Sequence, residues 1–463
     1  MNLRILRIEL RRSVALWAGA VVLATAVAYL HLIPGPWWTG TVLWTAQWTS
    51  MALWTRCLLF FLWPLAVGFG ALQGLRDHRS KMSELLTSTP RPARHRAATL
   101  AGTVACTVAS AFALLVLLGT VRVLAGDASY THLGWLPISL VGALALGSGA
   151  VLGMGVARAL PSVLTPPALV VCALLFNQFL RQTQTLDDVV PTSAAPNRVS
   201  LLSPSVADVR ETLLTLSVPV HLGQTLWLLG MAATGLALLV AAGPRARLLA
   251  LTPLLAGGVL ALLLLPSEPR DTYVIDRAAA ARVCDGPVCV TTLQRARLDD
   301  VAGPGREALR LLRGALGDQA PVAIRETTVL RAILSTPERS RDTVLIDFDD
   351  RVIGDARGER LTRALVGQGM VPLCYARSDT ESGTLEETVA QSIATAWVLG
   401  EDPRPLDGTV HAASDQADEA RPVWKKLTAL PRPEQQRRIS ALHAAAVSCS
   451  GDPLAVLSDG ASR

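Results

Sequence analysis

Charged residues are scarce in this sequence and are missing altogether from seven of its apolar stretches. They make up 17% of the 463 residues, whereas apolar residues make up 51%. This balance is too apolar for an ordinary soluble globular protein. The stretches without Asp, Glu, Lys or Arg are Val14–Ile33, Cys57–Leu75, Ala97–Val121, Trp135–Val156, Val163–Leu180, Leu222–Gly243 and Leu248–Pro266.

Each of these stretches is long enough to cross a bilayer as an α-helix, which takes about 20 largely apolar residues. A charge at mid-membrane costs roughly 2.5 kcal/mol or more, so the complete exclusion of charge is informative. Buried helices of a large soluble protein are the alternative, but they seldom run this long without a polar face. We therefore predict a polytopic α-helical membrane bundle of about seven spans.

The sequence also lacks the signatures of several enzyme classes. It contains no G-x-x-x-x-G-K-[ST] phosphate loop, no H-E-x-x-H zinc motif and no G-x-S-x-G nucleophile elbow. Asp347, Asp349 and Asp350 follow a predicted strand and could bind a cation or form an acid/base pair. Acids at such a position are more often solvated turn residues, which is what we expect here. We predict no catalytic site, no metal and no cofactor.

Basic residues are distributed unevenly between alternate connections of the seven stretches. If the N-terminus lies inside, the inner connections contain thirteen basic residues. The outer connections then contain three, or five if Arg56 and Arg122 at span edges are included. This asymmetry predicts a cytosolic N-terminus in a bacterial plasma membrane, and seven crossings then put residues 267–463 outside. The net charge of +6 lies largely beside apolar segments, which favours membrane orientation over nucleic-acid binding.

Tryptophans and cysteines agree with this orientation. The first outer connection is rich in Trp, as expected for an aromatic belt at the outer membrane interface: Trp37, Trp38, Trp44, Trp48 and Trp54. Four of the seven cysteines, Cys284, Cys289, Cys374 and Cys449, fall in the region predicted to lie outside, where disulfides persist.

The cysteine spacing suggests how they are used. Cys284 and Cys289 flank an Asp-Gly-Pro turn, which favours a disulfide-locked hairpin over a zinc site that would need two further ligands. Whether Cys374 and Cys449 form a second bridge stays open.

Two basic segments flank the first spans. Residues 1–13, "MNLRILRIELRRS", indicate an amphipathic entry helix on the inner leaflet. The inner loop "RDHRSKMSELLTSTPRPARHR" contains a short predicted helix in which Met82, Leu85 and Leu86 share one face, with Glu84 pointing elsewhere. Orientation alone needs only charge, so the presented apolar face indicates docking to a partner.

With these two segments, roughly residues 1–245 resemble the permease subunit of a type 2 ABC exporter. The family has an entry helix, six spans, a coupling helix between the second and third spans, and a partly helical outer loop, here Arg181–His221. The resemblance implies that Met82, Glu84, Leu85 and Leu86 dock on a separate cytosolic ATPase. It also implies a second permease copy, in a homo- or heterodimer.

The C-terminal part departs from that family. We predict the entry helix at 1–13, a six-span domain at 14–247, a seventh span at 248–266 and an extracytoplasmic mixed α/β domain at 267–463. With its cysteine pair, the last of these resembles the outer domains of actinomycete exporter permeases. Predicted strands are Thr272–Asp276, Val288–Leu293, Val322–Thr327 and Thr343–Phe348. Predicted helices are Gly305–Leu316, Glu359–Val366, Leu385–Leu399 and Pro433–Val447.

Two other functions stay open. The chain could be a membrane-anchored sensor or scaffold whose outer domain binds a ligand or partner, or, more remotely, a membrane-tethered hydrolase. The cargo of an exporter is not readable from the sequence. Since no span carries a charge, a lipid-like or peptide cargo is favoured over an ionic one.

Overall fold

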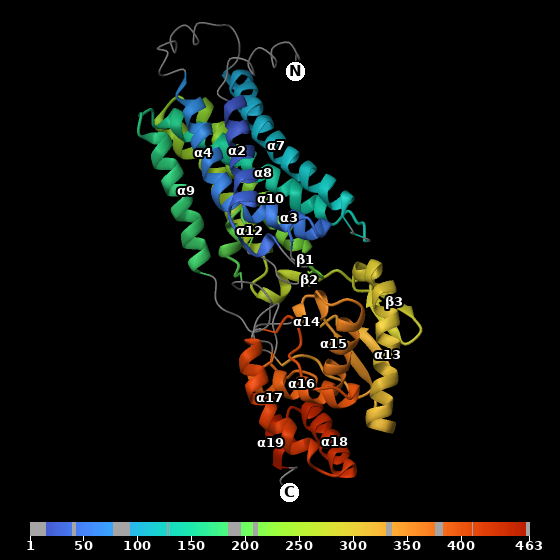
Figure 1. The fold of residues 1–463 in the computed structure, drawn as a ribbon. Coiled ribbons are helices and arrows are strands. Elements are labelled where there is room, and N and C mark those ends of the chain that lie inside the picture. The colour runs from blue at the N-terminus through green and yellow to red at the C-terminus, as the bar shows by residue number, and fades with distance from the viewer. Residues whose placement is uncertain are drawn as a thin grey trace.

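The structure is a computed structural model that describes residues 15–38, 43–76, 93–126, 128, 130–183, 196–206, 212–329, 336–375, 383–409 and 411–459. Apolar helices from the first part of the chain pack side by side, and a sheet with further helices lies beyond one end of them (Figure 1). The predicted entry helix at 1–13 lies outside the described residues, as do the predicted coupling residues Met82, Glu84, Leu85 and Leu86.

A helix occupies each of the seven predicted apolar stretches. The helices of this bundle are α2 (Ala15–Leu32), α3 (Trp48–Cys57), α4 (Leu59–Gly74), α7 (Ala93–Ala125), α8 (Trp135–Ala159), α9 (Thr165–Gln182), α10 (Val218–Val240), α11 (Pro244–Leu249) and α12 (Thr252–Leu264). Short 3-10 turns occur at η1 (Pro36–Trp38) and η2 (Ser200–Leu202).

Fewer than seven of these helices meet the length and hydropathy expected of a membrane span. Within the described residues four do so: Arg94–Leu124, Trp135–Ala159, Val218–Val240 and Pro244–Leu264. A fifth is obtained if α3 and α4, which meet at a bend of 51°, count as one span. The predicted number of about seven is therefore too high by this measure, because α2 is short and α9 carries the polar residues Asn177, Gln178 and Arg181. Several apolar helices of this kind nevertheless indicate a membrane-embedded protein.

The outward-facing surfaces of the bundle are apolar. Contact between such surfaces and water is unfavourable, whereas contact with lipid is not. Leu117 and Leu118 of α7 are 55% and 50% exposed, and Leu255 and Leu263 of α12 are 67% and 71% exposed. The chain thus buries one face of these helices against neighbours and leaves an equally apolar face uncovered.

Glycines allow the helices of the bundle to approach closely around α8. A Cβ atom on Gly70 of α4 would overlap the backbone of Ala150 on α8, and one on Gly155 of α8 would overlap that of Gly235 on α10. The seventh predicted span packs in the same way, since a Cβ on Gly257 of α12 would lie 3.1 Å from the Cα of Gly230. α12 is therefore part of the bundle.

The C-terminal part has the mixed α/β character that the sequence predicts. Its strands and turns are β2 (Tyr273–Ile275), β3 (Arg282–Asp285), β4 (Val288–Thr291), β5 (Ala323–Glu326), β6 (Thr343–Ile346), η3 (Pro269–Asp271), η4 (Thr292–Arg297) and η5 (Gly317–Gln319). Its helices are α13 (Leu298–Leu316), α14 (Arg351–Gly354), α15 (Gly358–Met370), α16 (Leu385–Leu399), α17 (Ala413–Thr428), α18 (Arg432–Ser448) and α19 (Pro453–Asp459).

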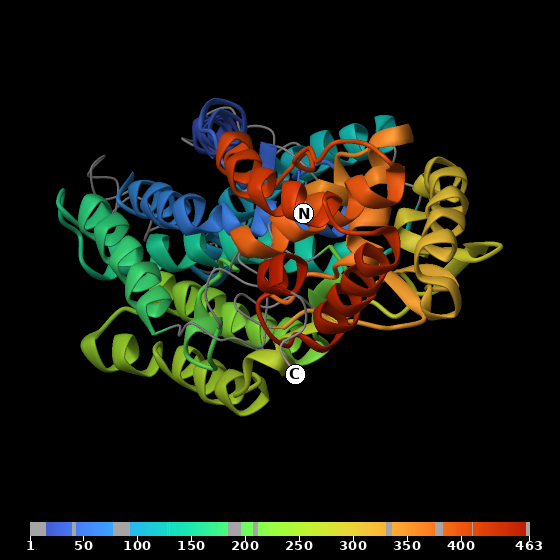
Figure 2. The same ribbon diagram turned by 60° about the horizontal axis from the view of Figure 1, so that its bottom comes forward.

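Four strands form one mixed sheet in the order β3-β4-β5-β6. β3 and β4 are an antiparallel hairpin, whereas β4, β5 and β6 run parallel. α13 makes the crossover between β4 and β5 and lies with the hairpin at one edge of this region (Figures 1 and 2). The carboxyl ends of β5 and β6 therefore meet at the same edge of the sheet.

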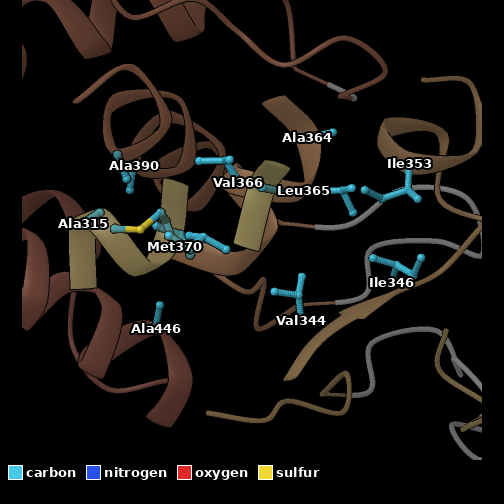
Figure 3. Packing of buried hydrophobic residues seen from close by; sticks show 14 of the residues in the cluster. Ala315, Val344, Ile346, Ile353, Ala364, Leu365, Val366, Met370, Ala390 and Ala446 are labelled. Carbon is cyan, nitrogen blue, oxygen red and sulfur yellow. The ribbon is translucent and has the colours of Figure 1, made fainter. Parts of the chain in front are cut away.

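The core of this region lies between the sheet and α15 and α16. Val344 and Ile346 of β6, Leu365 and Met370 of α15 and Ala390 of α16 belong to one buried apolar cluster, part of which Figure 3 shows. α16 has the predicted bounds, and its predicted apolar stripe is buried: Val389, Ile393, Ala396 and Trp397. Its polar residues Thr388, Gln391, Ser392 and Thr395 are buried as well, so α16 is covered on all sides.

Candidate functional site

A fully buried arginine lies where α3 meets the other helices. Arg56 has no exposed surface, and its guanidinium donates hydrogen bonds to three separate segments of the chain. Nε and Nη2 bond the carbonyl of Pro204 at 3.1 and 2.9 Å, Nη1 bonds that of Ile138 at 3.1 Å, and Nη2 bonds Gln224 Oε1 at 2.9 Å. These acceptors are neutral oxygens, so carbonyl and amide dipoles stabilise the charge here.

The segment 196–206, part of the predicted outer loop, is held by other helices of the bundle too. Gln224 of α10 donates from Nε2 to the carbonyls of Leu201 and Ser203 at 3.0 and 3.2 Å. Asn177 of α9 accepts from Ser203 Oγ at 3.2 Å and donates to the carbonyl of Phe60 on α4 at 3.1 Å. Arg56, Gln224 and Asn177 thus fix this segment to α3, α10, α9 and α4, and we call this set the polar hub.

Two parts of the predicted outer loop, and the α7–α8 connection, contact the chain that follows α12. β1 (Leu214–Leu216) pairs antiparallel with β2, with Thr215 opposite Val274. Arg198 Nε donates to the carbonyl of Leu265 at 2.9 Å, and the Tyr130 hydroxyl, from the α7–α8 connection, lies 3.3 Å from Asp276 Oδ2. Connections predicted to lie on the outer side therefore gather at the base of the C-terminal region.

Acidic side chains line a narrow cleft where β1 approaches the mixed sheet. Thr212 and Leu213 line it from one side, and Glu326, Asp347 and Asp349 from the other. The pKa of Glu326 is raised to about 8, mainly by burial and to a smaller extent by the nearby Asp347 and Asp349, although a 2.5 Å hydrogen bond from the Thr291 backbone amide opposes the shift.

The strand-end aspartates are not the solvated turn residues that we expected. Asp349 and Asp350 are only 7% and 6% exposed. The reason is local: Asp350 accepts a 3.0 Å hydrogen bond from the amide of Val352 and so caps α14, and Asp347 accepts one of 2.8 Å from the amide of Asp349. Among the described residues no group of three or more His, Cys, Asp or Glu side chains is arranged to hold a metal ion.

An apolar cavity of about 350 Å³ opens between α2, α4 and α9. Its lining includes Tyr29 of α2, Phe61 and Pro64 of α4 and Leu174 of α9, and no charged residue among those that the structure describes lines it. This volume falls within the roughly 300–1,000 Å³ range of small-molecule pockets. The cavity suits an apolar chain.

The tryptophans of the first connection mostly point inward. Trp38 is 43% exposed, whereas the other four are 6–7% exposed: Trp37, Trp44, Trp48 and Trp54. Trp37 packs edge-on against Trp54 with ring centroids 5.3 Å apart, and Trp48 stacks on Trp135 of α8 at 5.4 Å. Their place at a membrane interface stays a prediction, but Trp37, Trp48 and Trp54 pack α3 against neighbouring parts of the bundle.

Both candidate cysteine pairs lie at disulfide distance. Cys284 and Cys289 are opposite each other on β3 and β4 with Cα atoms 4.1 Å apart, as the hairpin interpretation predicts. Cys374 and Cys449, left open by the sequence, also form a disulfide, with Cα atoms 5.8 Å apart. The second bridge joins the chain after α15 to the end of α18.

The polar hub was not predicted from the sequence, which assigned Arg56 only to a span edge. The signal that could have indicated it is an arginine directly before the charge-free stretch that begins at Cys57, with Gln224 and Asn177 inside two other apolar stretches. Polar side chains in such stretches usually contact one another or backbone carbonyls. No family model, no curated protein and no solved structure matches this chain.

Proposed function

We propose that this chain is the permease subunit of an ABC-type exporter in a bacterial plasma membrane, driven by a separate cytosolic ATPase and working with a second permease copy. In this proposal the short α2 and the partly polar α9 cross the membrane together with the bent pair α3–α4 and the four longer apolar spans, and these seven crossings place residues 267–463 outside. The charge-free stretches, the asymmetry of basic residues and the predicted coupling helix with Leu85 support it.

The observation that carries the proposal is the apolar cavity between α2, α4 and α9. A bundle that only anchors an outer domain needs no cavity of about 350 Å³, whereas a permease for a lipid-like cargo needs an apolar surface that the cargo contacts. No charged residue in the described part of the chain lines it, which favours an acyl chain or another apolar group over an ionic cargo.

A contiguous path connects the predicted docking loop to the C-terminal region. α4 ends just before that loop and α7 begins just after it, so a motion of the loop would act first on these two helices. α4 continues into α3 through the bend at Leu58, and Arg56 of α3 holds the segment 196–206. Arg198 of that segment bonds the carbonyl of Leu265, where the chain leaves α12 for the C-terminal region. ATP-driven movement of the loop would be transmitted along this path in an alternating-access cycle.

The docking part of the proposal is tested with Leu85→Asp in the full chain, purified with an affinity tag in mild detergent. We expect loss of a co-purified phosphate-loop ATPase and of its ATP hydrolysis, because a carboxylate would interrupt the apolar docking face. Ser83→Asp adds the same charge on another side of the predicted helix and is expected to retain both. Equal retention by the two variants, together with undiminished export, would refute the coupling assignment.

A membrane-anchored sensor or scaffold is the second candidate function. The observation that favours it is a cavity in the C-terminal region that is lined in part by the polar residues Asp347 and Gln391. A domain that only covers the outer end of a transport path does not need such a cavity, whereas a domain that binds a ligand does. Under this alternative no ATPase co-purifies with the unaltered chain, and Leu85→Asp has no effect.

A further inference from the structure

The disulfide between Cys284 and Cys289 lies at an exposed edge of the mixed sheet. β3 is the first strand in the order β3-β4-β5-β6, and Cys284 on β3 is opposite Cys289 on β4. Figure 1 shows β3 beside α13 at one side of the C-terminal region. Cys284 is exposed, whereas Cys289 is only 9% exposed. A reagent in solution therefore reaches Cys284 more readily than Cys289.

The edge position also leaves open the direction from which a thiol must approach. In thiol–disulfide exchange a thiolate attacks one sulfur from the side opposite to the sulfur that departs. Cys284 lies on the edge side of Cys289, and among the described residues no strand pairs with the outer side of β3. Attack on Cys284 thus comes from outside the sheet, and Cys289 is the sulfur that departs.

Arginines lie on the same face of the sheet as the disulfide. Arg325 of β5 is the register partner of Cys289 in the parallel β4–β5 pair, so the two side chains point to the same face. Arg282, two residues before Cys284 on β3, points to this face as well. Both arginines are exposed. A cation beside a cysteine stabilises its thiolate, which makes Cys289 a better leaving group.

The acid that follows Cys284 in sequence is paired with a base. Asp285 accepts a 2.8 Å hydrogen bond from Nη1 of Arg306 on α13. As the next residue along the strand, Asp285 also points to the face opposite to that of Cys284. Its carboxylate therefore does little to oppose the effect of Arg325 on a thiolate at Cys289.

The second disulfide has a carboxylate beside it in place of a guanidinium. Cys449 is exposed, and the backbone amide of Cys374 donates a 3.0 Å hydrogen bond to Oε1 of Glu387, which is only 8% exposed. A carboxylate close to a cysteine disfavours the thiolate form of that cysteine. The Cys374–Cys449 bridge is therefore an internal reference for the Cys284–Cys289 bridge.

We propose that Cys284–Cys289 is a site of thiol–disulfide exchange with a small thiol that carries a negative charge. The thiolate of this compound attacks Sγ of Cys284, the S–S bond breaks, and Sγ of Cys289 departs as a thiolate beside Arg325. A second molecule of the thiol attacks the sulfur of the first, which releases Cys284 and forms the disulfide of the compound. Two thiols thereby lose two electrons and two protons, and the two cysteines gain them. Arg282 and Arg325 attract the negative charge of the compound.

The proposal does not depend on export, since both cysteines and both arginines belong to the C-terminal region. Its test measures the reduction of both bridges in the full oxidised chain in mild detergent, with 2-mercaptoethanesulfonate as the probe. Acid quenching, alkylation and peptide mass spectrometry follow the two bridges separately. We expect Cys284–Cys289 to be reduced at least about tenfold faster than Cys374–Cys449. Equal rates, or faster reduction of Cys374–Cys449, would overturn the proposal.

Variants separate the effect of charge from the effect of exposure. Arg325→Gln keeps a long polar side chain and is expected to slow the reduction of Cys284–Cys289 by about threefold or more. Arg313→Gln removes an exposed arginine of α13 and is the control, which is expected to react like the unaltered chain. An unchanged rate in Arg325→Gln would show that exposure alone determines the reactivity and would overturn the proposal.

The preference for a negative charge is tested with 2-mercaptoethanol, a neutral thiol of the same chain length. The ratio of the two rate constants, 2-mercaptoethanesulfonate over 2-mercaptoethanol, is compared between variants, so that the intrinsic difference between the reagents cancels. We expect this ratio to fall about twofold or more in Arg282→Gln at low ionic strength, and to stay the same in Arg313→Gln. A ratio that Arg282→Gln leaves unchanged would contradict an anionic thiol.

A cysteine flanked by acids in a protein partner has the same chemistry as a small anionic thiol. A tripeptide of glutamate, cysteine and glutamate, blocked at both ends, is the further arm of the experiment. Reduction by 2-mercaptoethanesulfonate at the expected relative rates, with or without reduction by the peptide, supports the proposal. Reduction by the peptide alone would assign the site to a protein partner and contradict the small thiol.

Discussion

Arg56 Nη2 lies 2.9 Å from Oε1 of Gln224, so a guanidinium at the end of α3 is joined to an amide on α10 that is 168 residues away in sequence. The same guanidinium also bonds the carbonyls of Pro204 and Ile138. One side chain therefore connects α3, α8, α10 and the segment 196–206. This connection lies on the path by which the proposed permease would pass motion from its docking loop to the C-terminal region.

Arg56→Met is expected to destabilise the protein by on the order of 3 kcal/mol, because it leaves several buried oxygens without donors. The midpoint of thermal unfolding in detergent measures the effect. Arg122→Met is the control, since Arg122 is exposed in the last turn of α7 and its loss is expected to change stability by no more than about 0.5 kcal/mol. Similar midpoints for the two variants would contradict the role of Arg56.

Two glycines in helices of the bundle should respond in opposite directions to the same substitution. Gly70→Ala is expected to destabilise by about 1–3 kcal/mol, because the new Cβ would overlap the backbone of Ala150 on α8. Gly102→Ala has open space around its Cβ and is expected to stabilise α7 by up to about 1 kcal/mol. Thermal unfolding of both variants tests the packing, and stabilisation by Gly70→Ala would be inconsistent with it.

The two disulfides should contribute unequally to stability. Cys374–Cys449 spans 75 residues and Cys284–Cys289 spans five, and the chain-entropy relation gives about 4 and about 2 kcal/mol for the two closed loops. Replacing both cysteines of a pair by serine is therefore expected to lower the unfolding midpoint more for the long loop than for the hairpin. Thiol counting under denaturing conditions checks that both bridges form, and four reactive thiols from these positions in the oxidised protein would show that neither does.

Glu326 should make stability depend on pH. Its pKa is raised to about 8 in the folded protein, mainly by burial, from an ordinary value of 4.5. The folded state therefore holds this proton more tightly, and the stability present below pH 4.5 is lost progressively as the pH rises to about 8.

Glu326→Gln stays neutral throughout and can still accept the hydrogen bond from the Thr291 amide. We expect its unfolding midpoint to exceed that of the unaltered chain at pH 8 and the difference to shrink toward pH 5. A constant difference across this range would show that Glu326 titrates normally.

Long apolar runs and strong periodicity made much of the fold predictable. α16 has the predicted bounds Leu385–Leu399, and β5 and β6 lie inside their predicted stretches. α17 (Ala413–Thr428) was missed because its sequence is largely polar and carries Pro422 inside the helix. β1 was missed because three residues are too short for a period-two pattern, and its pairing with β2 is set by tertiary contact.

The candidate sites were harder to predict because they depend on distant parts of the chain. The cavity at the ends of β5 and β6 combines Asp347, which the sequence singled out, with Gln391, which lies on a helix predicted only to pack on the sheet. The arginine beside Cys289, Arg325, becomes visible only when β4 and β5 are paired in register.

The most direct test of the account is the side of the membrane on which each end of the bundle lies. Glu419→Cys places a thiol on the exposed surface of α17, and Arg245→Cys places one on the short exposed helix α11 between α10 and α12. With a membrane-impermeant maleimide on intact bacterial cells, we expect labelling at position 419 and labelling at position 245 only after permeabilisation. Labelling at 245 but not at 419 in intact cells would contradict the proposed topology and, with it, an exporter whose C-terminal region faces outward.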